Sequence, residues 1–370
     1  MAASRRWTLA DMPDQSGRTV LVTGATSGLG LHSAIALAAA GARVLLTARE
    51  QARGEVALAR VREEGDPAGD IAELVALDLA DLASVRRAAA QVRERTADRL
   101  DVLMNNAGVM GTPRATTVDG FELQIGTNHH GHAALTWLLM PALRGAQADR
   151  PTTLRGAQAD RPTTPRGAQA DRPTTPRGAQ ADRPTTPRGA QADRPTTPRG
   201  AQAARVVTVS SLAHRGGGLD LDDLHFRRRR YVAAQAYSQS KLANLLFAAE
   251  LDRRLRAHGD DVLSVAAHPG VADTELLANS LRRRNPLLMM LSVPITSLFT
   301  QDVRRGMLPQ LYAATAPGVR GGEYYGPGGP AEMFGRPAPA VRSDAARDEM
   351  LARRLWEITA ADTGVQPDPA

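Results

Sequence analysis

The chain has 370 residues, of which 42% are hydrophobic and 23% are charged, with 46 lysines and arginines against 39 acidic residues and no cysteine. The absence of cysteine excludes a disulfide scaffold, thiolate metal sites and a cysteine nucleophile. The first residues lack the apolar core of a signal peptide, and no apolar run reaches the roughly 18 residues that cross a membrane. We therefore expect no signal peptide, no membrane span and a cytoplasmic protein.

The first 143 residues alternate short apolar strands with amphipathic helices. We expect strands at 19–23, 43–47, 71–77 and 100–104, and helices at 31–40, 50–64, 82–96 and 120–143. Apolar strands joined by helices indicate parallel pairing with helices on both faces of the sheet. The sequence therefore predicts an α/β fold with a single doubly wound parallel sheet of the Rossmann type.

A glycine-rich segment lies between the first predicted strand and the first predicted helix. It runs from Thr23 to Gly30 and reads T-G-A-T-S-G-L-G. Glycines permit a tight turn and a close backbone approach, and the helix N-terminus offers free N–H groups to a pyrophosphate. A purely structural turn would use the same residue types. We expect a dinucleotide-binding turn formed by Gly24, Thr26, Ser27, Gly28, Leu29 and Gly30.

The residue about twenty positions beyond such a turn selects between NAD and NADP. Here it is Arg49, at the end of the second predicted strand, where an NAD enzyme would place an acidic residue. A guanidinium pairs well with the 2′-phosphate of NADP, and Arg53 could assist one helical turn later. We therefore expect NADP(H). In the alternative interpretation Arg49 is simply exposed and Glu50 binds the ribose.

A tandem repeat occupies residues 144–203. The unit R-G-A-Q-A-D-R-P-T-T-(L/P) occurs five times and is followed by a truncated copy, and these 60 residues carry a net charge of +6. Each copy contains Gly and Pro and lacks a core-forming side chain, so we expect a mostly disordered insertion in one domain formed by 1–143 and 204–370. The insertion enters at the end of the sheet opposite the ligand-binding edge, so we expect it to leave the site unaffected. The alternative is an arginine-rich arm that binds an anionic partner. Without the repeat the net charge is +1, so we expect no nucleic-acid partner.

Beyond the repeat, we expect strands at 205–209 and 262–267 around a helix at 236–258. Tyr237 and Lys241 lie four residues apart and therefore on one face of this helix. Tyrosine has a pKa near 10, too high for acid–base chemistry at neutral pH, and the neighbouring ammonium should lower it. Lys241 is the only lysine in the chain. A chain that otherwise uses arginine retains lysine where a compact cation with a tunable pKa is needed, which indicates a catalytic role.

Six ordered segments together resemble the classical short-chain dehydrogenase/reductase family. They are the glycine turn, Leu77-Asp78-Leu79, Asn105-Asn106-Ala107-Gly108, Asn128, Ser210-Ser211 with Tyr237-x-x-x-Lys241, and Pro269-Gly270 with Thr274 beyond. The resemblance covers about 1–143 and 204–365. The stretches V-S-S-L-A-H, Y-S-Q-S-K-L-A-N-L-L-F and G-G-E-Y-Y-G resemble the retinol-dehydrogenase-like branch and its bacterial relatives.

The resemblance implies roles for these residues. Ser211 would hold and polarise the substrate oxygen, Tyr237 would exchange the proton, and Asn128 would relay protons through water to solvent. Lys241 would also hydrogen-bond the nicotinamide ribose. The other expected cofactor contacts are Asp78, Leu79, Asn106, Ala107, Gly108, Pro269, Gly270 and Thr274.

We therefore expect an NADP(H)-dependent oxidoreductase that interconverts a hydrophobic alcohol and its aldehyde or ketone. The alternative is a non-catalytic dinucleotide-binding module whose repeat binds an anionic partner. We expect no metal at His129, His130 and His132, because the sequence places no acidic or thiolate ligand near them. The resemblance also allows a homodimer, with the oligomeric state left open.

Overall fold

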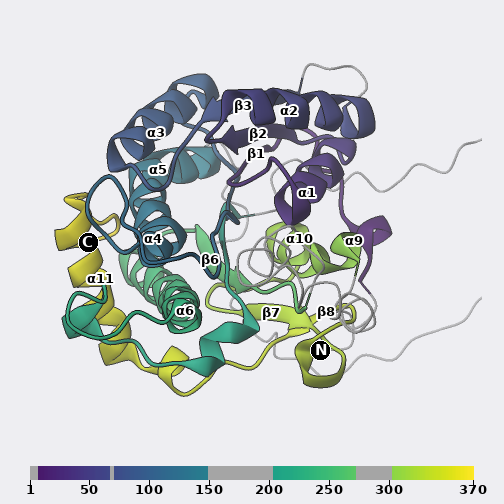
Figure 1. The fold of residues 1–370 in the computed structure, drawn as a ribbon. Coiled ribbons are helices and arrows are strands. Elements are labelled where there is room, and N and C mark those ends of the chain that lie inside the picture. The colour runs from purple at the N-terminus through teal and green to yellow at the C-terminus, as the bar shows by residue number, and fades with distance from the viewer. Residues whose placement is uncertain (1–6, 67–70, 149–202, 272–301) are drawn as a thin grey trace, which may run out of the picture.

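The computed structural model describes residues 7–66, 71–148, 203–271 and 302–370. Its centre is one eight-stranded sheet in the order β3-β2-β1-β4-β5-β6-β7-β8 (Figure 1). All neighbouring strands are parallel except β7 and β8. The strands are β1 (Thr19–Val22), β2 (Arg43–Ala48), β3 (Ala72–Ala76), β4 (Val102–Asn105), β5 (Arg205–Val209), β6 (Leu263–Ala267), β7 (Tyr324–Pro327) and β8 (Pro337–Pro339). The predicted doubly wound α/β fold is confirmed.

Helices cover both faces of the sheet and enclose two large hydrophobic cores. One face packs against α1 (Gly28–Ala39), α2 (Gln51–Gly65) and α10 (Leu308–Thr315), with the short α9 (Val303–Gly306) beside α1. The other face packs against α3 (Leu82–Thr96), α5 (Gly131–Ala148), α6 (Ala233–His258) and α11 (Glu349–Thr363). The apolar runs of the central strands follow from burial on both faces, which parallel sheets of this kind require.

The predicted helix at 120–143 is divided into separate pieces. The structure has a short α4 (Leu123–Ile125), a π-helical turn (Gly126–His130) and then α5. Such π turns place an extra residue in one helical turn and occur often at functional sites. By contrast, α3 and β5 have the predicted bounds, because their apolar periodicity and their flanking residues agree.

The C-terminal helix α11 covers the outer surfaces of α5 and α6 (Figure 1). Trp356 is 3% exposed and stacks on Phe247 of α6, with ring centres 5.4 Å apart. It also meets Trp137 of α5 edge-on at 4.9 Å. This aromatic cluster anchors the end of the chain. None of the helices within the described residues is long and apolar enough to span a bilayer.

The repeat begins inside a helix, which corrects the predicted helix end at residue 143. Helix α5 continues through the first five residues of the repeat to Ala148. Arg144 contributes to the fold, because its guanidinium pairs with Asp260 at 2.8 Å and with Asp368 at 2.6 Å. The rest of the predicted disordered insertion, up to residue 202, lies outside the described residues.

Both junctions of the insertion lie at the amino ends of the strands. The Leu100 N–H, just before β4, donates to the carbonyl oxygen of Ala142 on α5 at 3.0 Å. The Arg205 N–H, at the start of β5, donates to the carbonyl oxygen of Asp101 at 2.9 Å. The insertion therefore departs from the edge of the sheet opposite the carboxyl ends.

Candidate active site

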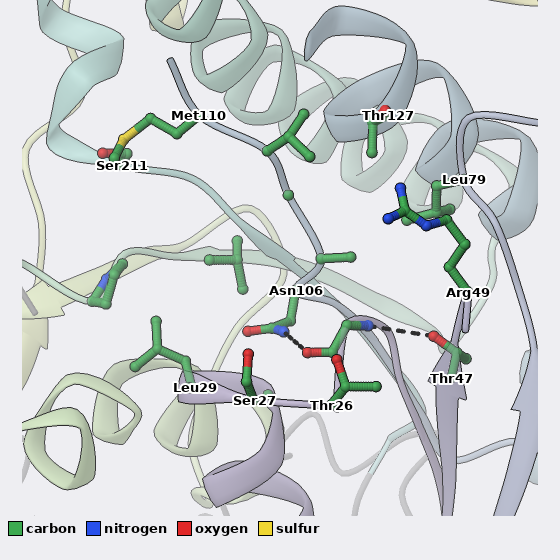
Figure 2. Close-up of a pocket in the computed structure, with 18 of the residues that line it drawn as sticks. Thr26, Ser27, Leu29, Thr47, Arg49, Leu79, Asn106, Met110, Thr127 and Ser211 are labelled. Atoms are coloured by element: carbon green, nitrogen blue, oxygen red, sulfur yellow. Dashed lines mark hydrogen bonds between the residues drawn. The ribbon is translucent and has the colours of Figure 1, made fainter. Parts of the chain in front are cut away.

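A cleft of about 510 Å³ lies at the carboxyl ends of β1, β4, β5 and β6, the edge where open α/β sheets bind ligands. Figure 2 shows Ser211 and Met110 together at one end of this cleft and Arg49 toward the other. Asn128 does not line the cleft, and Thr274 lies outside the described residues. The cleft brings together the other predicted site residues: Gly24, Thr26, Ser27, Gly28, Leu29, Gly30, Arg49, Asp78, Leu79, Asn106, Ala107, Gly108, Ser211, Tyr237, Lys241, Pro269 and Gly270.

The glycine turn packs tightly against the loop that follows β4. A Cβ atom on Gly24 would lie 2.7 Å from the Cα of Ala107, and one on Gly30 would lie 2.3 Å from the carbonyl oxygen of Gly24. Gly24 also has a φ of +65°, which glycine adopts without strain. Asn106 closes the turn, because its Nδ2 donates to the carbonyl oxygen of Thr23 at 2.8 Å. The two segments therefore form one fixed floor of the cleft (Figure 2).

The end of the cleft beside β2 carries excess positive charge. Thr47 ties β2 to the glycine turn, since its Oγ1 accepts the Gly24 N–H at 3.3 Å. The Glu50 carboxylate lies between two guanidinium groups, 3.1 Å from Arg49 Nη2 and 3.2 Å from Arg53 Nε. One acidic side chain is thus shared by two basic ones, and all three are more than half exposed.

The segment after β3 forms the neighbouring wall. The Asp78 carboxylate accepts the Ala80 N–H at 2.9 Å, and the Asp78 N–H donates to Ser84 Oγ at 3.0 Å. Leu79 packs against the start of α5, where a Cβ atom on Gly131 would lie 2.4 Å from the Leu79 carbonyl oxygen. These contacts hold the Asp78–Leu79 segment at the cleft.

Ser211, Tyr237 and Lys241 meet at the opposite end of the cleft. Ser211 follows β5 and hydrogen-bonds the Tyr237 phenol. Tyr237 and Lys241 both belong to α6, and Lys241 Nζ lies 5.7 Å from the centre of the Tyr237 ring. The ammonium group is buried and donates to the carbonyl oxygen of Val209 at 3.2 Å. Serine, phenol and ammonium are therefore arranged around one point of the cleft.

Burial determines the protonation of both α6 residues. It raises the pKa of Tyr237 to about 12, although the hydrogen bond with Ser211 acts in the opposite direction. It lowers the pKa of Lys241 to about 8. In the protein alone, the loss of hydration of the phenolate outweighs the hydrogen bond with Ser211, and the expected lowering of the Tyr237 pKa by Lys241 stays a prediction.

Asn128 lies outside the cleft and connects two segments next to it, the loop after β4 and helix α6. Its Oδ1 accepts the Val109 N–H at 2.8 Å, and its Nδ2 donates to the Val109 carbonyl oxygen and to Ser240 Oγ, both at 2.9 Å. Its own carbonyl oxygen accepts from His132 Nδ1 at 3.0 Å. Asn128 therefore holds the loop after β4 against α6, and its predicted proton relay stays a prediction.

The histidines of the π-helical turn and α5 point to different partners. His132 contacts Thr23 of the glycine turn, His129 contacts Thr359 of α11, and each Nε2–Oγ1 distance is 2.9 Å. Because the Asn128 carbonyl can only accept, the His132 proton lies on Nδ1 and its Nε2 accepts from the Thr23 hydroxyl. Burial lowers the pKa of His132 to about 4, so the ring is neutral. This buried contact supports the glycine turn, and sequence reasoning missed it.

An acidic residue does lie next to His130, which corrects the expectation that none is near. Helix α11 brings Asp362 Oδ2 to 2.9 Å from His130 Nε2 and 3.2 Å from His225 Nε2. The ligand atoms of these three residues lie within 4.8 Å of one another. However, the Glu122 N–H donates to His225 Nδ1 at 3.3 Å, so the His225 proton lies on Nε2 and faces the carboxylate. A metal at Nε2 would need the other tautomer, so this geometry fits hydrogen bonds to Asp362.

Gln124 also escaped sequence reasoning, although it organises the wall near Ser211. This fully buried amide accepts the Gly111 N–H at 3.0 Å and donates to the Tyr231 hydroxyl and the Ala233 carbonyl oxygen, both at 2.9 Å. It thereby links the loop after β4 to the start of α6. The only sequence signal was a polar residue on the apolar face of a predicted helix.

Comparison with known proteins agrees with this geometry. A family model described as short chain dehydrogenase matches residues 18–150. The chain is 34% identical over 352 residues to retinol dehydrogenase 13 from Homo sapiens, an alignment that covers 95% of this chain and 86% of that protein. The chain belongs to the short-chain dehydrogenase/reductase family.

Other relatives support the same assignment. This short-chain dehydrogenase/reductase is 36% identical to polyprenol dehydrogenase from Mus musculus, over 93% of this chain and 83% of that protein. A crystal structure of an uncharacterised protein from Mycobacterium paratuberculosis covers 97% of this chain and 98% of its own, with 37% identity and a TM-score of 0.67. The predicted resemblance to retinol dehydrogenases is confirmed, and the protein is an oxidoreductase of the alcohol/carbonyl class.

Proposed function

We propose that this enzyme uses NADP(H) to interconvert a hydrophobic alcohol and its aldehyde or ketone, with Tyr237 as the general acid/base. One observation carries the proposal. Ser211, Tyr237 and Lys241 meet at one end of a cleft whose other end holds the glycine turn and Arg49.

The cleft fits a dinucleotide by the shape of its floor. Gly28 has a φ of +53°, and a Cβ atom there would meet nothing within 4 Å, so the start of α1 is open to a ligand. The unpaired N–H groups of this helix start suit a pyrophosphate. When bound, the dinucleotide supplies or accepts the hydride and, in its oxidised form, brings a positive charge near the phenol.

The proton chemistry follows from the two shifted pKa values. A phenol with a pKa of about 12 is protonated at neutral pH and can donate to a carbonyl oxygen held by Ser211. Lys241, with a pKa of about 8, is still largely an ammonium at that pH and stabilises the resulting phenolate. Near neutral pH the phenol therefore carries the proton that reduction needs, and the lysine carries the positive charge that stabilises the phenolate.

Two features support the choice of NADP(H) and of a hydrophobic substrate. Arg49 and Arg53 share the single carboxylate of Glu50, which leaves a positive charge for a 2′-phosphate. Besides the polar side chains at this end, the described lining includes four apolar ones from the segments after β4, β5 and β6: Val109, Met110, Leu212 and Val271. Such a wall suits an apolar carbonyl compound.

A panel of apolar aldehydes and ketones, assayed by loss of NADPH absorbance, tests the proposal. We expect turnover with at least one carbonyl compound and a fall in kcat of at least about a hundredfold in Tyr237→Phe, the loss typical of a missing acid/base group, with NADPH binding retained. Tyr312→Phe is the matched control, because the Tyr312 ring packs against Trp7 and Tyr325 and does not line the cleft. Dinucleotide binding without turnover on any member, together with salt-sensitive DNA binding, would favour the non-catalytic module instead.

A further inference from the structure

His268, at the end of β6, is held in one orientation beside the cofactor cleft. The side chain is fully buried, and its ring lies 5.2 Å from the Tyr324 ring. A Cβ atom on Gly326 would lie 1.8 Å from His268 Nε2, so the ring packs directly on the β7 backbone. The imidazole therefore has no room to turn, and its two nitrogens face fixed partners.

The partners of His268 define its tautomer. The Gly270 N–H donates to His268 Nδ1 at 3.1 Å, so Nδ1 carries no proton. Burial lowers the pKa of His268, so the ring is neutral and its proton lies on Nε2. Nε2 donates to Glu332 Oε2 at 3.2 Å. The carboxylate thereby stabilises the one tautomer that can accept the Gly270 N–H.

Glu332 is built into the loop between β7 and β8 as a fixed charge. Oε1 accepts the Val341 N–H at 2.9 Å, and Oε2 pairs with Arg215 Nη2 at 2.7 Å. Burial alone would raise the pKa of Glu332, but the hydrogen bond from His268, the Val341 N–H and the charge of Arg215 outweigh it and lower the pKa to about 2. Both Glu332, at φ +58°, and the preceding Ala331, at φ +50°, adopt the left-handed region. Non-glycine residues in this region carry strain that the surrounding contacts must overcome.

The same loop supports the Pro269–Gly270 turn through its backbone. The Val271 N–H donates to the Met333 carbonyl oxygen at 2.9 Å. A Cβ atom on Gly270 would lie 2.3 Å from that oxygen, so the turn and the loop are in close contact. Pro269 and Gly270 line the cleft, and Arg215 belongs to the turn that follows Ser211. Glu332 therefore connects two segments that meet at the catalytic end of the cleft.

We propose that Glu332 is a positioning residue for the dinucleotide. Through the His268 tautomer it fixes the Gly270 N–H, and through Arg215 it joins the Pro269–Gly270 turn to the segment after Ser211. The proposal rests on the proposed function, because it assumes that the cleft binds NADP(H). With the other tautomer, Nδ1–H and the Gly270 N–H would face each other as two donors, and the turn would lose its side-chain hydrogen bond.

Glu332→Gln is the first test, because it keeps the shape and removes the charge. Its amide offers one acceptor oxygen where the carboxylate offers two, so either the Val341 N–H or both His268 and Arg215 lose their acceptor. We expect the dissociation constant of NADPH, measured by fluorescence titration, to rise about three- to tenfold, as for the loss of one hydrogen bond. Ala331→Gly is the matched control, since it relaxes the neighbouring strained residue, keeps the carboxylate and should leave NADPH binding unchanged.

His268→Asn separates positioning from general stability. An asparagine oxygen accepts the N–H two residues later without any choice of tautomer. In the His268→Asn background, Glu332→Gln should therefore raise the dissociation constant of NADPH by a smaller factor than in the wild type, because only the contact with Arg215 is still at stake, even where thermal denaturation shows lost stability. An equal effect of Glu332→Gln in both backgrounds, or none in the wild type, would overturn the inference while the proposed function stands. A wild-type protein that binds neither NADPH nor NADH would overturn both.

Discussion

Removal of five repeat units tests whether the insertion and the active site are independent. Because the repeat has a period of 11 residues, deletion of 145–199 joins Arg144 to Gly200 and leaves the sequence R-G-A-Q-A-A-R before the rest of β5. The five residues that form the last turn of α5 are thus restored in sequence and become the connection to β5. Both junctions lie at the amino ends of the strands, and a five-residue strand separates them from Ser211 by roughly 17 Å.

The energetic effect of this deletion is small, because two contributions to the unfolding free energy oppose each other. If the insertion is disordered, as the sequence predicts, each doubling of its length costs about 0.6 kcal/mol, so shortening the connection roughly tenfold returns about 2 kcal/mol of unfolding free energy. The last turn of α5 must partly unwind, which puts at risk the ion pairs of Arg144 with Asp260 and Asp368. For a partly exposed arginine these are worth about 1 kcal/mol or less each. We therefore expect a deleted protein no less stable than the full chain.

Kinetics and denaturation together provide the assay. We expect kcat and KM for NADPH within about twofold of the full chain, and an unchanged or higher midpoint in urea. Deletion of two units, 155–176, is the control, since it changes the loop length but neither junction. A large loss of kcat or a large rise in KM in the five-unit deletion would refute the reasoning. Salt-sensitive binding to DNA by the full chain, lost on deletion, would support the arginine-rich arm instead.

Three further results follow from the site and the core. The kcat/KM of carbonyl reduction should decline as pH rises through about 8, because Lys241 then loses the proton and with it the positive charge that stabilises the phenolate. A flat kcat/KM profile up to about pH 10 would contradict this. Arg49→Ala combined with Arg53→Ala should raise KM for NADPH about tenfold or more and leave KM for NADH within about threefold, and equal changes for both cofactors would argue against phosphate recognition. Trp356→Ala should reduce the unfolding free energy, measured in urea, by about 3–5 kcal/mol. Met350 lies on the same helix with its side chain 73% exposed, so Met350→Ala should reduce it by less than about 0.5 kcal/mol. Similar losses in both variants would refute the anchoring role of the aromatic cluster.

Sequence patterns did not predict the strands at the C-terminal edge of the sheet. Strand β8 has the sequence Pro-Ala-Pro, which no strand pattern predicts, and it pairs antiparallel with β7 only because the sheet offers a free edge there. The π-helical turn likewise interrupts a continuous helical pattern. Here packing between distant segments overrode local preference.

The sequence by itself determined the alternation of strands and helices, the glycine turn and the joint position of Tyr237 and Lys241 on one helix face. These features depend on dihedral angles and side-chain directions within a few residues, so local patterns specify them. Only the tertiary structure decided that Asp362 reaches His130, that Glu332 reaches His268, and that burial moves the pKa of Tyr237 upward. Each of these depends on partners far away in the chain or on the loss of water, and neither is encoded in the spacing of neighbouring residues.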